Sequence, residues 1–555
     1  MNPWWIKLFT AAALIAILGA YARMERRLVL PACGEPDTAA YFALAERMAA
    51  GEPPAQTERD PFRKQEHTWV ETPQGELVAK YPPGYPALMA AGLRLGGETG
   101  AYLASPIMGG LTLVAAWLLF GLWMSRPLGL LAVLMLALNP MFVFYTSYPL
   151  AHAAEVCFVT WGMYFLWSWV RTPRSGAGLA AGLCLGFSVL VRPTSLLYGL
   201  ALLPALATGA DRARREGGRW IRPALALLIG YGACLVVQAG YNFALFGDPL
   251  KTGYALSGEQ SAFTWADFHN NIGYMVRAMP DCVSVFFALG LVGVLALRGW
   301  GERLMAWLWF LPVFLLYTAY YWIMPIHGWA NTRFVMGPFP LLIGASFALM
   351  DRISFEGWRG WRIGAAAGVS AVVVTCQWPA LLNVLARPTY HVPTVQQLAA
   401  ADHAAAALAR GAVIFAEPPA ACHINRGKDF VLYDLSVFRS ESWERLFNPA
   451  PGEPRHQPER LQQFRRFYQV YGDVLEEEKR DLVLNYLEQG RQVAFVLPKY
   501  RLAQERTSLG PSYSLAAKAE WETLGYSDYD YGGARHGPRS SPKATWTLCV
   551  AAKAK

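Results

Sequence analysis

Long apolar runs recur along the first two thirds of the chain. The first, WWIKLFTAAALIAILGAYA, extends from Trp4 to Ala22 and is long enough to cross a bilayer as a helix. It has no clear small-residue cleavage site, so we interpret it as an uncleaved anchor. Further apolar runs occupy residues 101–122, 127–145, 151–170, 177–191, 193–209, 221–243, 282–297, 304–323, 334–350 and 363–382. The pattern predicts an α-helical membrane protein with about eleven spans.

Two regions between the apolar runs refine this expectation. The short runs 177–191 and 193–209 are separated only by Arg192 and Pro193, and they suit a tight hairpin. How this region is divided changes the number of spans by about two, to as many as about thirteen. The polar stretch 23–100 contains two helical patterns with one apolar side, which we interpret as amphipathic helices at the membrane surface.

The pattern changes after residue 383, where charged residues become frequent and apolar runs become short. Four of these runs have the length of β-strands and alternate with helix-like stretches: 412–416, 430–435, 492–498 and 546–551. This predicts a membrane domain over 1–382 and a soluble α/β domain over 383–555. The segment RLQQFRRFYQVYGD, residues 460–473, is typical of a helix with a solvated basic face.

Composition and charge support a membrane protein and orient it. Hydrophobic residues make up 54% of the chain and charged residues 16%, whereas soluble chains carry about a quarter charged residues. One set of alternate short connections holds thirteen Lys and Arg residues, and the opposite set holds three. The positive-inside rule places the richer set in the cytoplasm. Loops 23–100 and 243–281 and the tail are then expected outside the cytoplasmic membrane, in the periplasm, although three arginines just after the first span oppose this.

The external loop begins with an acidic motif, EPD, at residues 35–37. Asp37 precedes a helical pattern, and Tyr41 lies one turn later on the same side. One interpretation is a helix N-cap, since Asp accepts backbone N–H bonds there and favours the helix dipole. The other is a carboxylate that acts in chemistry, with Glu35 beside it. The two are compatible, because a capped helix holds a carboxylate rigidly.

The same loop ends in KYPPGYP, residues 80–86. Tandem proline stiffens the chain, and Pro86 suits the first turn of a helix, so the stretch is interpretable as a simple turn. The alternative is that the turn holds Lys80 and Tyr81 at the membrane face. A lysine placed there pairs readily with a phosphate.

Further motifs recur in a fixed order after these two. VRPTSLL lies between two short spans, YNFALFGDPLKTGY occupies 241–254, and HGWANTRFVMGPFPLL occupies 327–342. Taken together over about residues 1–382, the set resembles the C-type membrane glycosyltransferases. It is similar in particular to bacterial relatives of the protein O-mannosyltransferases and of the lipid A aminoarabinose transferase.

The resemblance implies transfer of a sugar from a polyprenyl-phosphate donor to a lipid, glycan or protein acceptor, outside the membrane and with inversion. The family's catalytic acidic residue falls on Asp37 and its acidic neighbour on Glu35. The cations that meet the donor phosphate fall on Lys80 and Arg333, with Tyr81 beside them. This agrees with the chemistry, since a hydroxyl that attacks an anomeric carbon needs a base, and a leaving phosphate gains charge that cations stabilise.

Other candidates for the substrate cleft are weaker. Glu155 matches an acidic position of the family at the outer end of the fourth span, with His152 one turn before it. These two side chains would also satisfy each other as a buried polar pair. Lys251 and Tyr254 either line the cleft or belong to an external turn, and His327 either lines it or anchors the chain at the interface. Arg192 is interpreted as a side chain that extends to the interface.

Two other classes of protein fit the apolar pattern. A multi-span transporter or lipid flippase also has many spans and internal charges, but the sequence has no repeated half. A structural membrane subunit leaves Asp37, Lys80 and Arg333 without a shared purpose. We expect no cofactor and no metal site, although Glu35 with Asp37 would suit a divalent cation. The predicted partners are the polyprenyl-phosphate-linked sugar, membrane lipids and an unidentified acceptor, with no nucleic acid.

Overall fold

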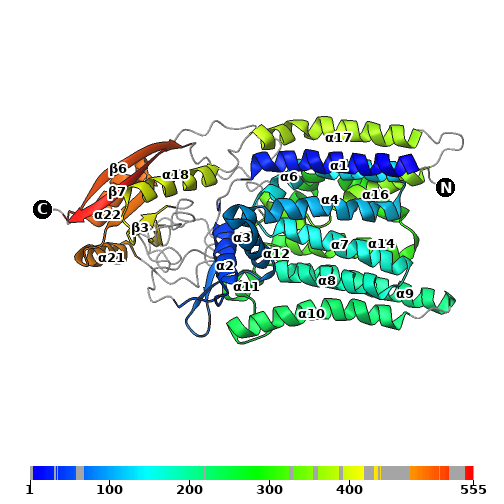
Figure 1. Ribbon diagram of the computed structural model, residues 1–555, viewed down its shortest axis with the longest axis horizontal. Coiled ribbons are helices and arrows are strands. Elements are labelled where there is room, and N and C mark those ends of the chain that lie inside the picture. The colour runs from blue at the N-terminus through cyan, green and yellow to red at the C-terminus, as the bar shows by residue number, and fades with distance from the viewer. Residues whose placement is uncertain are drawn as a thin grey trace.

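The computed structural model describes residues 4–29, 33, 36–57, 68–216, 220–323, 329–353, 361–386, 392–417, 430–435, 438, 475–511, 513–523 and 544–553. Figure 1 shows a bundle of long, roughly parallel helices, with a small sheet domain beyond one end of the bundle. The helices α2, α3, α11 and α12 lie at that same end (Figure 1). The described parts of the first polar loop and of the tail therefore lie at the same end of the bundle, as the sequence predicts.

The elements up to the middle of the chain are α1 (Trp4–Leu28), α2 (Pro36–Ala50), β1 (Trp69–Glu71), β2 (Leu77–Ala79), α3 (Gly84–Tyr102), α4 (Ala104–Trp123), α5 (Arg126–Ala137), α6 (Pro140–Ser147), α7 (His152–Arg171), α8 (Ser175–Val191), η1 (Pro193–Ala201), α9 (Leu202–Glu216) and α10 (Ile221–Phe246). The remaining elements of the bundle are α11 (Gly253–Leu256), η2 (Glu259–Ser261), α12 (Trp265–Val283), α13 (Phe286–Gly293), η3 (Val294–Ala296), α14 (Gly299–Thr318), α15 (Trp329–Thr332), η5 (Arg333–Val335), α16 (Phe339–Arg352) and α17 (Trp361–Ala386).

Within the described residues, five helical segments are long and apolar enough to cross a membrane. Up to eight qualify if each bent helix pair counts as one span. The bent pairs are α5 with α6, α12 with α13–η3, and α15–η5 with α16, at angles of 60°, 99° and 75°. The chain is therefore a polytopic membrane protein, and the predicted number of about eleven spans stays a prediction.

The apolar run 127–145 forms two helices rather than one continuous span. Pro140 starts α6, where its missing N–H removes no helical bond. Asn139 caps this helix by accepting a hydrogen bond from Phe142 N at 2.9 Å, and its amide donates to Cys282 O at 2.7 Å. The bend is thus held by a local cap and by one bond to a distant segment.

The short runs on either side of Arg192 form a hairpin. The end of α8 packs on the start of α3. Gly84 lies so close to the backbone of Leu190 there that a Cβ atom would clash. The start of α8 packs on Trp169 at Gly178, and the middle of α9 packs on the same side chain at Gly209. The chain therefore runs out along α8 and returns along η1 and α9.

The first polar loop has the two predicted helices, α2 and α3, and between them a hairpin that the sequence pattern did not predict. Its strands β1 and β2 are antiparallel, with Trp69 opposite Ala79. Directly after β2, the Lys80 N–H donates to the Thr68 carbonyl at 2.9 Å. The KYPPGYP segment therefore joins a strand to the start of α3 at Gly84, which agrees with its interpretation as a stiff turn before a helix.

The C-terminal part of the chain is the predicted α/β domain. Its elements are α18 (Val392–Ala407), β3 (Val413–Ala416), β4 (Val431–Asp434), α21 (Glu476–Glu488), β5 (Val493–Pro498), η9 (Lys499–Arg501), α22 (Leu502–Leu509), β6 (Tyr513–Thr523) and β7 (Ala544–Lys553). The sheet order is β4-β3-β5-β7-β6, parallel across β4, β3 and β5 and antiparallel across β5, β7 and β6. Alternate strand residues pack on α18 and on the α21–α22 side, so the sheet lies between helical layers. The predicted basic helix at 460–473 lies outside the described residues.

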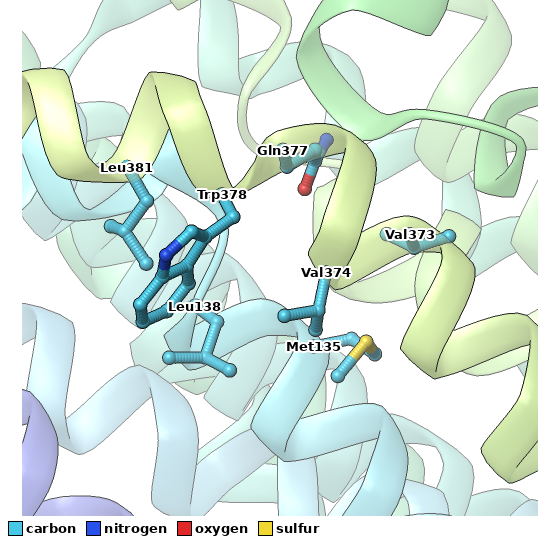
Figure 2. Close-up of a pocket in the computed structure, with 7 residues that line it drawn as sticks. All are labelled: Met135, Leu138, Val373, Val374, Gln377, Trp378 and Leu381. Carbon is cyan, nitrogen blue, oxygen red and sulfur yellow. The ribbon is translucent and has the colours of Figure 1, made fainter.

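On the side of the bundle, α17 packs across the end of α5. Figure 2 shows a small crevice between these two helices, in which the indole of Trp378 lies beside Leu138. The lining is apolar except for Gln377; its other members are Met135, Val373, Val374 and Leu381. The predicted boundary between the domains at 382 and 383 falls within α17, which continues to Ala386.

Candidate functional site

The candidate site lies at the end of the bundle nearest the sheet domain, where α2, α3 and α11 meet (Figure 1). Asp37 occupies the first turn of α2, where the helix dipole favours a negative charge. The Tyr81 hydroxyl donates to Asp37 Oδ1 at 2.6 Å, and Arg333 Nη2 lies 4.0 Å from Oδ2. The Asp37 side chain is still 27% exposed. Asp37 therefore does more than begin a helix, because residues distant in the chain orient a carboxylate that stays open to solvent.

Lys80 is buried beside the ring of Tyr81 and already has a counter-ion. Its side chain is 3% exposed, and its ammonium lies 2.6 Å from Glu259 Oε1. The rings of Tyr81 and Tyr254 lie beside the ammonium, each with its centroid 5.6 Å from Nζ. Such rings attract a cation through their quadrupole. Backbone packing fixes the lysine as well, since a Cβ on Gly253 would lie 2.3 Å from the Lys80 carbonyl oxygen.

Tyrosine rings form the wall between Asp37 and Lys80. Tyr41 packs on Tyr81 with ring centroids 4.1 Å apart, and Tyr81 meets Tyr254 edge-on at 6.0 Å. Burial, and next the charge of Asp37, raises the pKa of Tyr41 and of Tyr81 above the usual value. Burial raises the pKa of Tyr254 as well. These phenols therefore stay protonated at neutral pH and do not act as bases, and Tyr81 donates its proton to the hydrogen bond with Asp37.

Arg192 is the centre of a second polar group, at the turn between α8 and η1. Its Nε lies 3.3 Å from Glu155 Oε2, and its Nη1 lies 2.7 Å from His152 Nδ1. Its Nη2 donates to the Tyr317 hydroxyl at 2.6 Å, and Ser195 donates to Glu155 Oε1 at 2.9 Å. Glu155 is 1% exposed, so this network is a buried ion pair with surrounding hydrogen bonds.

Phe334 joins the two polar groups. The guanidinium carbon of Arg333 lies 5.0 Å from its ring centroid, and that of Arg192 lies 5.2 Å from it. Tyr317 stacks on the same ring at 4.9 Å, and His152 contacts it at 5.7 Å. The two arginines, each with its own carboxylate, are thus linked through one aromatic side chain into a single polar region.

The structure brings together most of the residues that the sequence singled out. Asp37, Lys80, Tyr81, Arg333, Tyr41 and Tyr254 form one part, and His152 and Glu155 belong to the adjoining network. Lys251 takes no part in these contacts among the described residues; its backbone N–H closes a turn on Asp248 O at 3.2 Å. Glu35 and His327 lie outside the described residues.

Sequence reasoning missed Arg192, Glu259 and Tyr317 as members of the site, and also Phe334, which joins the two polar groups. Arg192 was interpreted as a side chain that extends to the interface, yet it is paired with Glu155, which the sequence paired with His152. Glu259 and Tyr317 were not noticed, because a single acidic residue in a loop and one tyrosine in an apolar run carry no local pattern. One signal could have identified Arg192: it stands next to a proline between two apolar runs, where an unpaired charge is costly.

No group of three or more His, Cys, Asp or Glu side chains suited to a metal ion occurs in the described part of the chain. Asp37 faces the Tyr81 hydroxyl and the Arg333 guanidinium there, and both stabilise the ionised form of the carboxylate. The predicted absence of a metal stays a prediction, since Glu35 lies outside the described residues.

The fold is that of the C-type membrane glycosyltransferases, as the order of the motifs predicted. The chain is similar to the crystal structure of ArnT from Cupriavidus metallidurans bound to undecaprenyl phosphate, with a TM-score of 0.57 and 14% sequence identity over 99% of this chain and 98% of that chain. Against the apo state of the same protein the TM-score is 0.56 and the identity 14%, over 98% and 97% of the two chains. The similarity thus includes the C-terminal domain, which the motifs did not cover.

Sequence similarity is confined to part of the chain. Residues 80–239 match the family described as dolichyl-phosphate-mannose-protein mannosyltransferase. This segment begins at Lys80 and includes Glu155 and Arg192. No curated protein sequence is significantly similar to the chain.

Proposed function

We propose that the protein is a glycosyltransferase that moves a sugar from a polyprenyl-phosphate donor to a lipid, glycan or protein acceptor, with inversion. The observation that carries the proposal is a partly exposed carboxylate, Asp37, that lies close to buried cations at one end of a membrane bundle. Arg333 lies 4.0 Å from Asp37, and Tyr81, which donates to Asp37, has its ring beside the Lys80 ammonium. A transfer of this kind needs a base for the acceptor and positive charge for the leaving phosphate.

Asp37 is the base in this proposal. An acceptor hydroxyl attacks the anomeric carbon, and Asp37 takes the proton from that hydroxyl as the new C–O bond forms. Its first-turn position and the hydrogen bond from Tyr81 hold the carboxylate in one orientation, which lowers the entropic cost of the encounter. Glu35 is proposed to assist beside it. The bond between the anomeric carbon and the phosphate oxygen breaks, and both electrons leave with the phosphate.

Lys80 and Arg333 receive that charge. Both side chains are largely buried, at 3% and 9% exposure, and a cation in such a place acts more strongly than in water. Tyr81 contacts both parts of the site, since it donates to Asp37 and its ring lies beside the Lys80 ammonium. The fold shared with ArnT, whose crystal structure holds undecaprenyl phosphate, supports a lipid phosphate as the donor carrier.

The remaining predicted residues are assigned to the walls of the substrate cleft. Tyr41 and Tyr254 are adjacent to the proposed phosphate position through their contacts with Tyr81. His152 and Glu155 shape the cleft indirectly, because both are bound to Arg192. The roles proposed for Lys251 and His327 rest on the sequence alone.

The proposed location is the cytoplasmic membrane, with the site and the C-terminal domain on its periplasmic side. The charge distribution supports this orientation, since the arginine-rich end of α9 lies away from the sheet domain (Figure 1). A lipid phosphate at the outer face would then reach Lys80 and Arg333 from the membrane.

The test compares purified wild type with Asp37→Asn in sugar transfer from polyprenyl-phosphate sugars. We expect a folded variant whose transfer is lower by about 10²–10⁴-fold, the usual contribution of a general base. The matched control is Asp351→Asn, which makes the same chemical change at a carboxylate that accepts two bonds from Ser125. Equal transfer by Asp37→Asn and wild type would remove Asp37 as the base. Lipid movement across vesicles without sugar transfer by any form would favour the flippase alternative.

A further inference from the structure

The ammonium of Lys80 is neutralised within the protein before any ligand arrives. Glu259 Oε1 lies 2.6 Å from Lys80 Nζ, and the two side chains are 13% and 3% exposed. The attraction between the charges of a buried, hydrogen-bonded pair is screened much less than that of an exposed pair. An anion that binds Lys80 must therefore compete with a carboxylate that already occupies its best position.

The backbone holds Glu259 in this place. It belongs to the segment between α10 and α12, which enters η2 through Gly258 in the left-handed region at φ 76°. Backbone bonds tie the end of the segment to the chain after α14: Tyr321 N donates to Ala262 O at 3.0 Å, and Thr264 N donates to Ala319 O at 2.9 Å. At its other end, Gly253 packs directly on the Lys80 backbone. Glu259 is thus a built-in anion rather than a surface side chain that happens to reach Lys80.

The charges around Glu259 are known. Lys80 acts on it from the turn after β2, Arg192 from the turn after α8, and Asp37 from α2. Tyr254 on α11 and Tyr320 after α14 are the tyrosines on which its charge acts. Burial raises the pKa of Glu259 above its usual value, against the opposing effect of the Lys80 charge.

We propose that Glu259 is the resident counter-ion that a phosphate ligand displaces from Lys80, and that it selects against the second negative charge of a phosphate monoester. This inference rests on the proposed function, in which the donor is a phosphodiester and the released lipid carrier is a monoester. A diester carries one negative charge, whereas a monoester carries about 1.5–2 at neutral pH. Repulsion by Glu259 grows in proportion to that charge, so the carboxylate opposes the product more than the donor and favours product release.

The experiment measures direct binding of two probes to the full-length protein in detergent at pH 8. The probes are a short-chain prenyl phosphate and the methyl diester of the same compound, which differ in charge and share the chain. We expect Glu259→Gln to bind the diester roughly threefold more tightly than wild type and the monoester roughly tenfold more tightly, because the lost repulsion scales with ligand charge. Glu259→Asp keeps the charge and should keep the wild-type ratio of the two affinities.

The matched control is Glu302→Gln, the same change at a buried carboxylate that pairs with Arg171. Glu302 lies fifteen residues before Tyr317 on α14, roughly 22 Å along the helix, and its variant should bind both probes like wild type. Unchanged or weaker binding of both probes by Glu259→Gln would overturn the proposal, since Glu259 would then only position Lys80. Equal tightening of both probes would also overturn it, because the effect would not depend on ligand charge.

A pH series with the diester separates competition from a structural role. The diester keeps its single charge over pH 5–8, so its own titration does not interfere. The pKa of Glu259 is raised above its usual value, so acidification protonates this carboxylate at a higher pH than an ordinary glutamate and releases Lys80. Wild-type affinity should then rise toward that of Glu259→Gln, whose affinity should stay flat; parallel pH profiles would contradict the proposal. These assays need no sugar transfer, so they fail independently of the Asp37→Asn test.

Discussion

The ion pair between Arg192 and Glu155 allows a quantitative prediction. Replacing Arg192 with Met keeps much of the side-chain volume but removes the positive charge beside the Glu155 carboxylate. This carboxylate is 1% exposed, and its remaining described hydrogen-bond donor is the Ser195 hydroxyl. The change also removes the bonds to His152 and Tyr317. Removing one partner of a buried pair costs about 3–5 kcal/mol, because the other charge stays buried and uncompensated. We expect a loss of this size in the free energy of unfolding.

The measurement is a double-mutant cycle from equilibrium unfolding in mixed detergent micelles. Glu155→Gln alone leaves the buried guanidinium uncompensated and should cost a similar amount. The double variant removes both charges, so it should be more stable than the sum of the single effects predicts, by about 1–3 kcal/mol. Arg171→Met serves as the control: its pair with Glu302 is more exposed on the arginine side, at 22%, and its loss should cost less. Additive effects, within about 0.5 kcal/mol, would refute the view that these two side chains compensate each other.

Two further changes test the packing around the site and the stability of the C-terminal domain. Gly253→Ala places a methyl group against the Lys80 backbone, so it should weaken binding of a prenyl phosphate about tenfold or more. Gly240→Ala is the control, because Gly240 has open space around it, and it should leave this binding unchanged. Equal binding by the two variants would contradict the proposed role of the contact between Gly253 and Lys80. Lys479→Met leaves Glu505, which is 1% exposed, without its 2.7 Å partner, and should destabilise the domain by about 3–5 kcal/mol. Limited proteolysis measures this loss, and a protease resistance equal to that of wild type would disprove it.

The sequence predicted the parts of the fold that follow from local patterns. Apolar runs marked most of the helices, and short apolar runs marked β3, β4, β5 and β7 of the C-terminal sheet. Strand β6 was missed because Lys518 and two glutamates interrupt its apolar residues on an edge of the sheet. The break between α5 and α6 had a local signal in Asn139 and Pro140, but the apolar character of the run outweighed it.

The candidate site, like the fold, was predictable from the sequence only in part. Asp37 and Lys80 lie in stretches with a clear helix start or turn, so their neighbourhood was predictable from the sequence and from the resemblance. The partners that give these residues their environment are far along the chain: Glu259 is 179 residues from Lys80, and Tyr317 is 125 residues from Arg192. No periodicity connects such positions, and their pairing follows only from the packing of the bundle.

This distance in sequence has a consequence for synthesis of the protein. At the usual rate of about 5–20 residues per second, the ribosome adds Glu259 roughly 10–35 s after Lys80. During that interval the lysine has no internal counter-ion and depends on water or lipid head groups at the membrane surface. The pair forms only when the segment before α12 has emerged, and Arg333 reaches Asp37 later still. The end of the bundle that holds the candidate site is therefore assembled late, and a chain that stops before residue 259 would lack the carboxylate that pairs with Lys80.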